Sequence, residues 1–243
     1  MRCHEVDHKI IGTDVQAVEI ELDPGEKVIA EAGAMIAMDD GIRFTTRMGD
    51  GSAANSGIMN AMMGIGKRML TGESVFLTHF ENTGTGKKCV TFAAPTPGQI
   101  VPLNMAYLGK DILCQKDAFL AAAFGTEVSM AFNRRLGAGF FGGEGFIMQR
   151  LVGDGMAYLQ AGGTLIKRNL KPDEKISIDT GCLVALTSDV DYSIEMAPGL
   201  KTMLFGGEGL FLATLRGPGT VWIQTMPFSK LAERIVSAVP SKK

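Results

Sequence analysis

Three glutamates that follow a glycine are the residues of this chain best suited to bind a cation. Glu73, Glu144 and Glu208 lie in the segments TGES, GGEG and GGEG, and the last two are 64 residues apart. Carboxylates that converge on one point can hold a cation. In a glycine-rich turn, however, a glutamate can also accept hydrogen bonds from the main chain. We expect the turn role, because no aspartates cluster nearby, and keep the cation site as the alternative.

Only one histidine or cysteine spacing in this chain is found in metal sites. His4 and His8 are four residues apart in HEVDH, which has the letters of an HExxH motif, but this motif needs a helix and the segment resembles the frayed start of a strand. The cysteines, which form no CxxC pair, are Cys3, Cys89, Cys114 and Cys182. We expect no metal site and four reduced thiols, as in a cytosolic protein.

Motifs of serine hydrolases and of phosphate-binding loops are missing from the chain. It contains no G-x-S-x-G or GxxxxGK[ST] segment, and its G-x-G pairs come before strands instead of helices, unlike phosphate-binding loops. With 24 Lys and Arg against 26 Asp and Glu, no global positive field would concentrate nucleic acid. We therefore expect a protein that is not an enzyme, holds no cofactor and binds no nucleic acid.

The elements that position these residues recur three times along the chain. The segment from 25 to 48 aligns without gaps with the segment from 173 to 196, and a weaker copy runs from 109 to 132. Matching positions include Val28 with Ile176, Ala37 with Ala185, and Ile112 and Ala121 from the weaker copy. Such self-similarity predicts a repeat architecture.

A second block follows each of these segments and gives the repeats their boundaries. Its order is a strand, a Gly-Glu turn, a strand, a G-x-G turn and another strand; Gly153 and Gly217, like Glu144 and Glu208, are 64 residues apart. We predict one domain over residues 1–243, with repeats at about 15–98, 99–163 and 164–228.

Alternation of apolar and polar residues predicts that these blocks are strands. In AVEIEL, the residues Val18, Ile20 and Leu22 can face a core while Glu19 and Glu21 face water. The alanine-rich stretch 118–124 favours a helix by propensity, but its place in the repeat predicts a strand. A short helix is predicted over 228–239 from the spacing of Phe228, Leu231, Ile235 and Val239, with Ser229 as N-cap and a role as lid or subunit contact.

An insertion of about 13 residues distinguishes the first repeat, because Met48 and Glu73 are 25 residues apart whereas Met196 and Glu208 are 12 apart. The segment Gly51–Leu70 is rich in Gly, Ala and Met. Methionine side chains adapt to varied partners, lipid included. As a candidate interaction surface we name Ile58, Met59, Met62, Met63, Ile65, Lys67, Arg68 and Met69. The alternative is an oligomer contact or a loop that covers the protein's own core.

The combination of EAGAMIAMDDGI, KRMLTGES and the GGEG blocks resembles the AIM-type family, named for altered inheritance of mitochondria, member twenty-four. The resemblance extends from about Val15 to Phe228. It implies an all-β fold: a three-repeat β-prism, similar to a double-stranded β-helix and related to the tryptophan RNA-binding attenuation protein, commonly assembled as a trimer. It implies no catalytic residues and points to a bacterial relative of unknown function.

Two functions from different classes fit the sequence. The first is a non-catalytic scaffold or interaction protein, a homotrimer that binds a protein or lies on a membrane surface. The second is a sensor of a small ligand or metal, with a pocket between repeats or subunits. The N-terminal segment MRCHEVDHKI lacks the apolar run of a secretory signal, so we expect a cytoplasmic location.

Overall fold

Strands form most of this computed structural model, which describes residues 2–48, 76–134, 146–196 and 211–239. A short strand, β1 (Asp7–Ile11), precedes three consecutive sets of six strands. The first set is β2 (Ala17–Leu22), β3 (Lys27–Glu31), β4 (Met35–Met38), β5 (Ile42–Met48), β6 (Phe76–Asn82) and β7 (Lys88–Ala93). The second is β8 (Gly98–Asn104), β9 (Asp111–Gln115), β10 (Phe119–Ala123), β11 (Glu127–Arg134), β12 (Phe146–Val152) and β13 (Met156–Gly162). The third is β14 (Leu165–Leu170), β15 (Lys175–Asp179), β16 (Leu183–Thr187), β17 (Asp191–Met196), β18 (Phe211–Arg216) and β19 (Gly219–Gln224).

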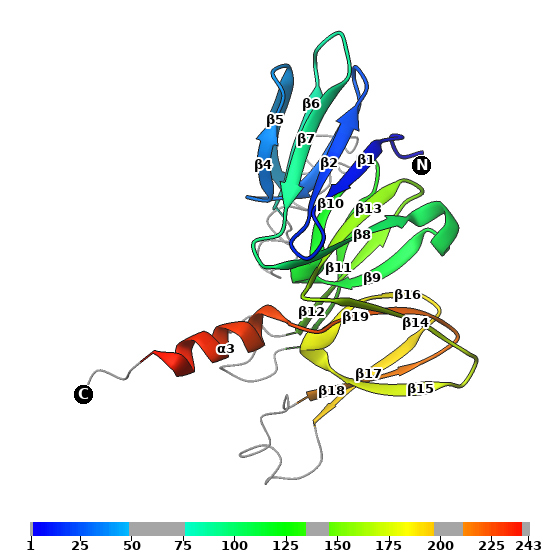
Figure 1. Cartoon of the computed structure of the whole chain (residues 1–243). Helices are drawn as coiled ribbons and strands as arrows, with labels where there is room; N and C mark the ends of the chain where they lie inside the picture. Colours follow the sequence, from blue (N-terminus) through cyan, green and yellow to red (C-terminus); the bar gives the residue numbers. More distant parts are fainter. Residues whose placement is uncertain (1, 49–75, 135–145, 197–210, 240–243) are drawn as a thin grey trace.

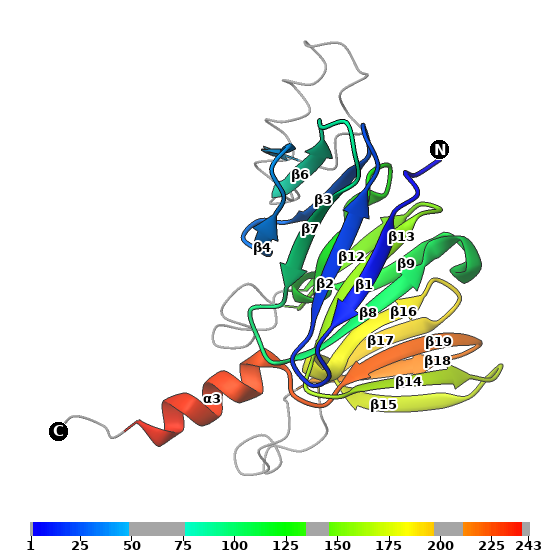
Figure 2. The same cartoon turned by 45° about the horizontal axis from the view of Figure 1, so that its top comes forward.

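Each set contains the same two groups of hydrogen-bonded strands. One group has the orders β2-β7-β4, β8-β13-β10 and β14-β19-β16; the other has the orders β5-β6-β3, β11-β12-β9 and β17-β18-β15. Consecutive sets are joined where β3 pairs with β10 and where β9 pairs with β16. Two six-stranded sheets result, and they lie between a four-stranded sheet at one end and a three-stranded sheet at the other (Figures 1 and 2).

An irregularity of register also occurs at the same place in all three sets. The pairing shifts between Met35 and Ala37 in β4, between Phe119 and Ala121 in β10, and between Leu183 and Ala185 in β16. A bulge of this kind bends the strand and increases its local twist. Each of the three strands therefore bends at the same place in its set.

The core follows the two-residue period that the sequence predicts. Along β2, Val18, Ile20 and Leu22 are fully buried and the intervening residues are half-buried. The buried side chains divide into three clusters, one of which includes Trp222 from β19 beside residues of the second set. Burial of one face of each sheet fixes the register, because a slip by one residue would expose the apolar face.

The stretch 118–124 contains a strand over its five central residues, and no helix of two turns, as the alignment predicts. Phe119–Ala123 forms β10, and Ala118 ends a short 3-10 turn. All five residues of β10 are buried, with β3 on one side and β13 on the other. Pairing with two neighbours satisfies the main chain, so tertiary contacts override the helical preference of alanine.

The C-terminal helix is α3 (Phe228–Ala238), which extends away from the sheets in both views (Figures 1 and 2). The prediction of Ser229 as N-cap is wrong: the helix begins at Phe228, its N-cap is Pro227, and no side chain caps it. Proline fits this position, since the first amides of a helix have no partner in the helix and Pro227 fixes an extended entry. Within the described ranges, no helix has the length and apolar character needed to cross a membrane.

A buried hydroxyl group gives a direct test of core packing. Tyr158 of β13 is fully buried against the ring of His8, and its Oη has no hydrogen-bond partner among the described residues. Burial raises the pKa of the Tyr158 hydroxyl. Because an unpaired buried polar group costs about 1 to 3 kcal/mol, Tyr158→Phe should not lower the free energy of unfolding and should raise it by about 1 kcal/mol.

Urea unfolding of Tyr158→Phe beside Tyr107→Phe measures this effect. Tyr107 is 87% exposed, so its hydroxyl is hydrated in both states and the control should leave stability unchanged. A loss of more than 1 kcal/mol in Tyr158→Phe would show that Oη has a hydrogen-bond partner in solution.

Candidate functional site

An acidic depression lies beside the N-terminal strand. Its volume is about 220 Å³, and it is lined by Glu5, Val6, Asp7, Glu21, Asp23, Glu26 and Lys87. These residues come from the N-terminal segment, from β2 and its turn into β3, and from the turn between β6 and β7. Side chains far apart in the sequence thus meet because β1 and β7 both pair with β2.

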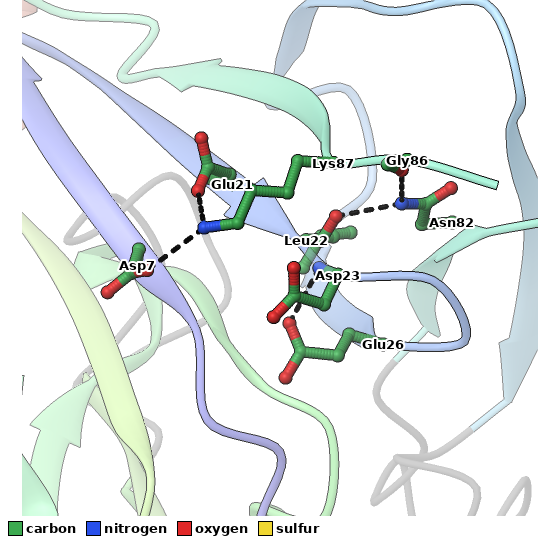
Figure 3. A network of polar contacts seen from close by, with 8 residues as sticks. All are labelled: Asp7, Glu21, Leu22, Asp23, Glu26, Asn82, Gly86 and Lys87. Carbon is green, nitrogen blue, oxygen red and sulfur yellow. Dashed lines mark hydrogen bonds and ion pairs between the residues drawn. The ribbon is translucent and has the colours of Figure 1, made fainter. Parts of the chain in front are cut away.

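Lys87 is the cation of this depression (Figure 3). Its Nζ lies 2.5 Å from Oε1 of Glu21 and 3.9 Å from Oδ2 of Asp7. The hydrogen bond to Glu21, with the charge of that carboxylate, raises the pKa of the Lys87 ammonium group. Lys87 therefore stays charged and neutralises part of the acidic cluster.

Asn82 holds the two turns beside the depression (Figure 3). Its buried side chain donates from Nδ2 to the carbonyl oxygens of Leu22 and Gly86, each at 2.8 Å. Next to it, Oε2 of Glu26 accepts a hydrogen bond of 2.8 Å from the amide of Asp23. These bonds fix the main chain that carries Asp23, Glu26 and Lys87, so the carboxylates are held close together before any ligand arrives.

The chemistry of the depression is electrostatic. Its five carboxylates and one ammonium group give it a strongly negative field, which attracts cations and basic groups. In the described part of the chain, no three His, Cys, Asp or Glu residues are grouped as metal ligands.

The site residues predicted from the sequence lie outside the residues that the structure describes. This applies to Glu73, Glu144 and Glu208 and to the whole of Gly51–Leu70 with its methionines. The segments that contain the three glutamates join β5 to β6, β11 to β12 and β17 to β18. All three therefore occupy the same position in their sets.

The contacts of His4 and the environments of the cysteines indicate structural roles. Nδ1 of His4 accepts a hydrogen bond of 3.0 Å from the amide of Lys27, and its ring packs edge-on against Phe124. The four cysteines are free thiols. Burial raises the pKa of the Cys114 thiol, which is fully enclosed, and burial with nearby carboxylates raises that of Cys89. Raised pKa values keep both thiols protonated and poorly nucleophilic.

The sequence predicted α3 as a lid or subunit contact, but its apolar side chains were not named as site residues. Four large apolar side chains of this helix and its C-cap are exposed: Phe228 (64%), Ile235 (57%), Val236 (72%) and Val239 (62%). Charged and polar residues such as Glu233 and Arg234 occupy the other side. Near its start, Lys230 Nζ contacts Oδ2 of Asp179 at 2.9 Å and attaches the helix to β15.

A half-buried carboxyl group at the junction of the first two sets is also perturbed. Glu31, at the end of β3, has a pKa raised to about 7 by burial, with a further contribution from the charge of Asp117 and a partial offset from Lys116. The third set has Asp179 at the end of β15, where Oδ1 accepts a hydrogen bond of 2.8 Å from the amide of Gly181. In the third set, the carboxylate at this strand end therefore stabilises the turn that follows.

Comparison with known proteins gives a family match and a fold match. Residues 8–226 match the family model described as Mitochondrial biogenesis AIM24. An uncharacterized protein of Streptococcus pyogenes serotype M6 is 29% identical over 233 residues, which cover 92% of this chain and 87% of that protein. The crystal structure of protein SPYM3_0169 from Streptococcus pyogenes is similar with a TM-score of 0.75 at 24% identity, covering 97% of this chain and 100% of that one. The likeness to this crystal structure shows the fold alone.

The raised pKa of Glu31 makes the stability of the fold depend on pH. A carboxyl group whose pKa is higher in the folded state binds protons more tightly there. Its contribution is fully present below about pH 4.5 and is lost as the pH rises through about 7. Glu31→Gln should remove this dependence and raise the free energy of unfolding at pH 8 by about 1 to 3 kcal/mol, with little change at pH 4.5.

Urea unfolding of both proteins between pH 4.5 and 8 measures the difference. Gln115 occupies the matching strand end in β9 and is buried, so Gln115→Glu provides the converse variant and should add a loss of stability as the pH rises. Equal pH profiles for Glu31→Gln and the parent would contradict the role of Glu31.

Proposed function

We propose, from the premise that the chain belongs to the Mitochondrial biogenesis AIM24 family, that it is a non-catalytic scaffold or interaction protein that works as a homotrimer. It binds a protein or a membrane surface through side chains displayed outside its β-core. The observation that carries this proposal is the exposed apolar stripe of α3.

Physical chemistry favours a partner for this helix. Its final two turns are exposed on every side, from Glu233 to Val239. A helix this short is marginal by itself in water, and most helical stability in proteins comes from packing of an apolar face. Burying Ile235, Val236 and Val239 against another surface would stabilise both the helix and the complex. Anchorage of its first turn at Asp179 presents that face in a fixed position.

The architecture that we propose for this protein is a three-repeat β-prism related to the tryptophan RNA-binding attenuation protein. The identical pairing orders and the bulge shared by β4, β10 and β16 support three structural repeats within one domain. A cytoplasmic location is supported by the four free thiols, which suit a reducing compartment.

Substitution on α3 tests the proposed interaction. Ile235→Asp combined with Val239→Asp places two charges on the apolar stripe and should reduce binding at least tenfold, because a buried unpaired carboxylate is strongly unfavourable. Binding is measured by co-sedimentation with vesicles of phosphatidylcholine and phosphatidylglycerol and by affinity capture of proteins from the native host.

Matched substitutions control for the added charge. Ser237→Asp combined with Arg234→Gln changes the net charge by the same two units at exposed polar positions of the same helix and should leave capture of a protein through the apolar stripe unchanged. Equal binding by the parent and the Ile235→Asp, Val239→Asp variant, on both vesicles and proteins, would remove α3 as the interaction element.

The acidic depression favours a second candidate function, a sensor of a small cationic ligand. Its carboxylates are held in place by Asn82 and the adjoining turns. Titration calorimetry with Ca²⁺ and with spermidine tests this function. Glu21→Gln should weaken binding at least fivefold, whereas Glu195→Gln on the distant strand β17 should not. A parent protein that binds neither probe at millimolar concentration would exclude this candidate.

A further inference from the structure

The outer side of β2 differs from the outer sides of its two counterparts, β8 and β14. These strands hold the same place, because the pairing orders are β2-β7-β4, β8-β13-β10 and β14-β19-β16. In the first set, β1 pairs antiparallel with β2 on that side. In the described structure, β8 and β14 have no such neighbour and end their sheets. The first set therefore shows that this place in the fold accepts an added strand.

The edge of β8 is closed to an added strand. The amide of Ile100 donates to Oε1 of Gln16 at 2.7 Å, and the carbonyl oxygen of Gly98 accepts a bond of 3.0 Å from the amide of Gln16. Main-chain groups of alternate residues face the same side of a strand, so the next residue to face outward is Pro102, which has no amide. Proline at such a place protects an edge strand from pairing.

The edge of β14 is open. The amide of Leu165 donates to Oε1 of Gln99 at 2.8 Å and so faces away from β19. By the same alternation, the amides and carbonyl oxygens of Lys167 and Asn169 face the free side, while the intervening residues pair with β19. Both residues are exposed, and no described strand lies on that side. Such a row of unpaired main-chain groups is a template for another strand.

Burial shows the space that an added strand would fill. Both β2 and β14 end two residues before a proline, Pro24 or Pro172, and this aligns Ile166 of β14 with Val18 of β2. Val18 is fully buried; Ile10 of β1 lies opposite it and packs against its cluster. Ile166 is 44% exposed. An apolar side chain in the place of Ile10 would bury Ile166 in the same way.

Charge on β14 indicates the chemistry of its partner. The strand, LIKRNL, carries Lys167 and Arg168 and no carboxylate, and its neighbour β19, GTVWIQ, has no charged residue. Arg168 contacts Glu174 at 3.2 Å. Lys167 holds the place of Glu19, which lies opposite Lys9 of β1. Opposite charges on facing strands stabilise pairing, so a strand that suits β14 has an acidic side chain where β1 has a lysine.

We propose that β14 is a docking edge for an extended acidic segment of a partner protein, which adds to the sheet as an antiparallel strand in the way that β1 adds to β2. Hydrogen bonds to the main chain of Lys167 and Asn169 give affinity, and alternate side chains give specificity. This surface is separate from α3. The inference therefore goes beyond the interaction proposed for that helix, and the two are measured independently.

Peptide binding tests the proposal with matched probes. The probe is an acetylated and amidated peptide, Thr-Glu-Glu-Ile-Val, whose residues take the places of β1 residues 7–11 in the observed register. Its second glutamate lies opposite Lys167 and directs its amide at the free edge, whereas the amide of the first glutamate faces away. N-methylation of the second glutamate should weaken binding at least tenfold, and N-methylation of the first should not.

Two methods measure the binding of these probes. One is the fluorescence of Trp222, the one tryptophan of the chain, whose ring centroid is 5.8 Å from Nζ of Lys167. The other is titration calorimetry, which does not depend on this contact.

Variants of the edge provide a second test. Asn169→Pro removes an outward amide while the amides that pair with β19 remain, so it should weaken binding at least tenfold. Lys167→Glu should reverse the preference, so that a probe with lysine in place of the second glutamate binds more tightly than the acidic probe. Lys9→Glu, on exposed β1, makes the same change of net charge and should leave binding unchanged.

The outcomes distinguish strand pairing from attraction of charge alone. Binding that depends on the amide of the second glutamate and reverses its preference in Lys167→Glu supports the docking edge. Equal binding of the two N-methylated probes overturns it. A parent that binds no probe at millimolar concentration also overturns it, and the charges of β14 then serve to protect the edge from pairing. Should circular dichroism show that Asn169→Pro is unfolded, the charge reversal and the N-methylated probes decide.

Discussion

Antiparallel main-chain pairing between consecutive sets of strands is the interaction on which this fold depends. The pairing of β3 with β10 and of β9 with β16 turns separate three-stranded groups into six-stranded sheets. A buried amide or carbonyl without a partner costs about as much as a lost hydrogen bond. Fully buried strands such as β10 and β16 are therefore stable only because both of their sides are paired.

Small side chains make these junctions compact. Ala121, Ala122 and Ala123 are completely buried in β10, opposite Ala30, Ile29 and Val28 of β3. Larger residues there would separate the sheets that pack around the junction, since protein interiors are close-packed. The second junction also has small side chains, with Ala185 opposite Cys114. The alanine-rich composition of this stretch thus reflects packing and not helix formation.

Outside the core, the surface provides two kinds of recognition that operate by different physics. The depression around Lys87 offers fixed carboxylates and acts through charge, which salt weakens. The stripe on α3 offers apolar area and acts through the hydrophobic effect, which salt does not screen. Lys230 and Asp179 connect α3 to the end of β15, so the displayed helix and the edge strand lie next to each other.

The sequence by itself determined the all-β class, the strand alternation seen in β2, and the extended state of 118–124, because each follows from local period or from alignment of similar segments. It also determined the existence of α3, although it misplaced the cap at Ser229. Its chosen site residues, from Ile58 to Met69 and Glu73, Glu144 and Glu208, lie outside the described structure. Only the tertiary structure decided which strands pair, that Glu5, Asp7 and Lys87 meet, and that β4 and β15 are left at edges. These features depend on contacts between residues distant in sequence, and periodicity along a chain carries no information on which strand will lie beside which.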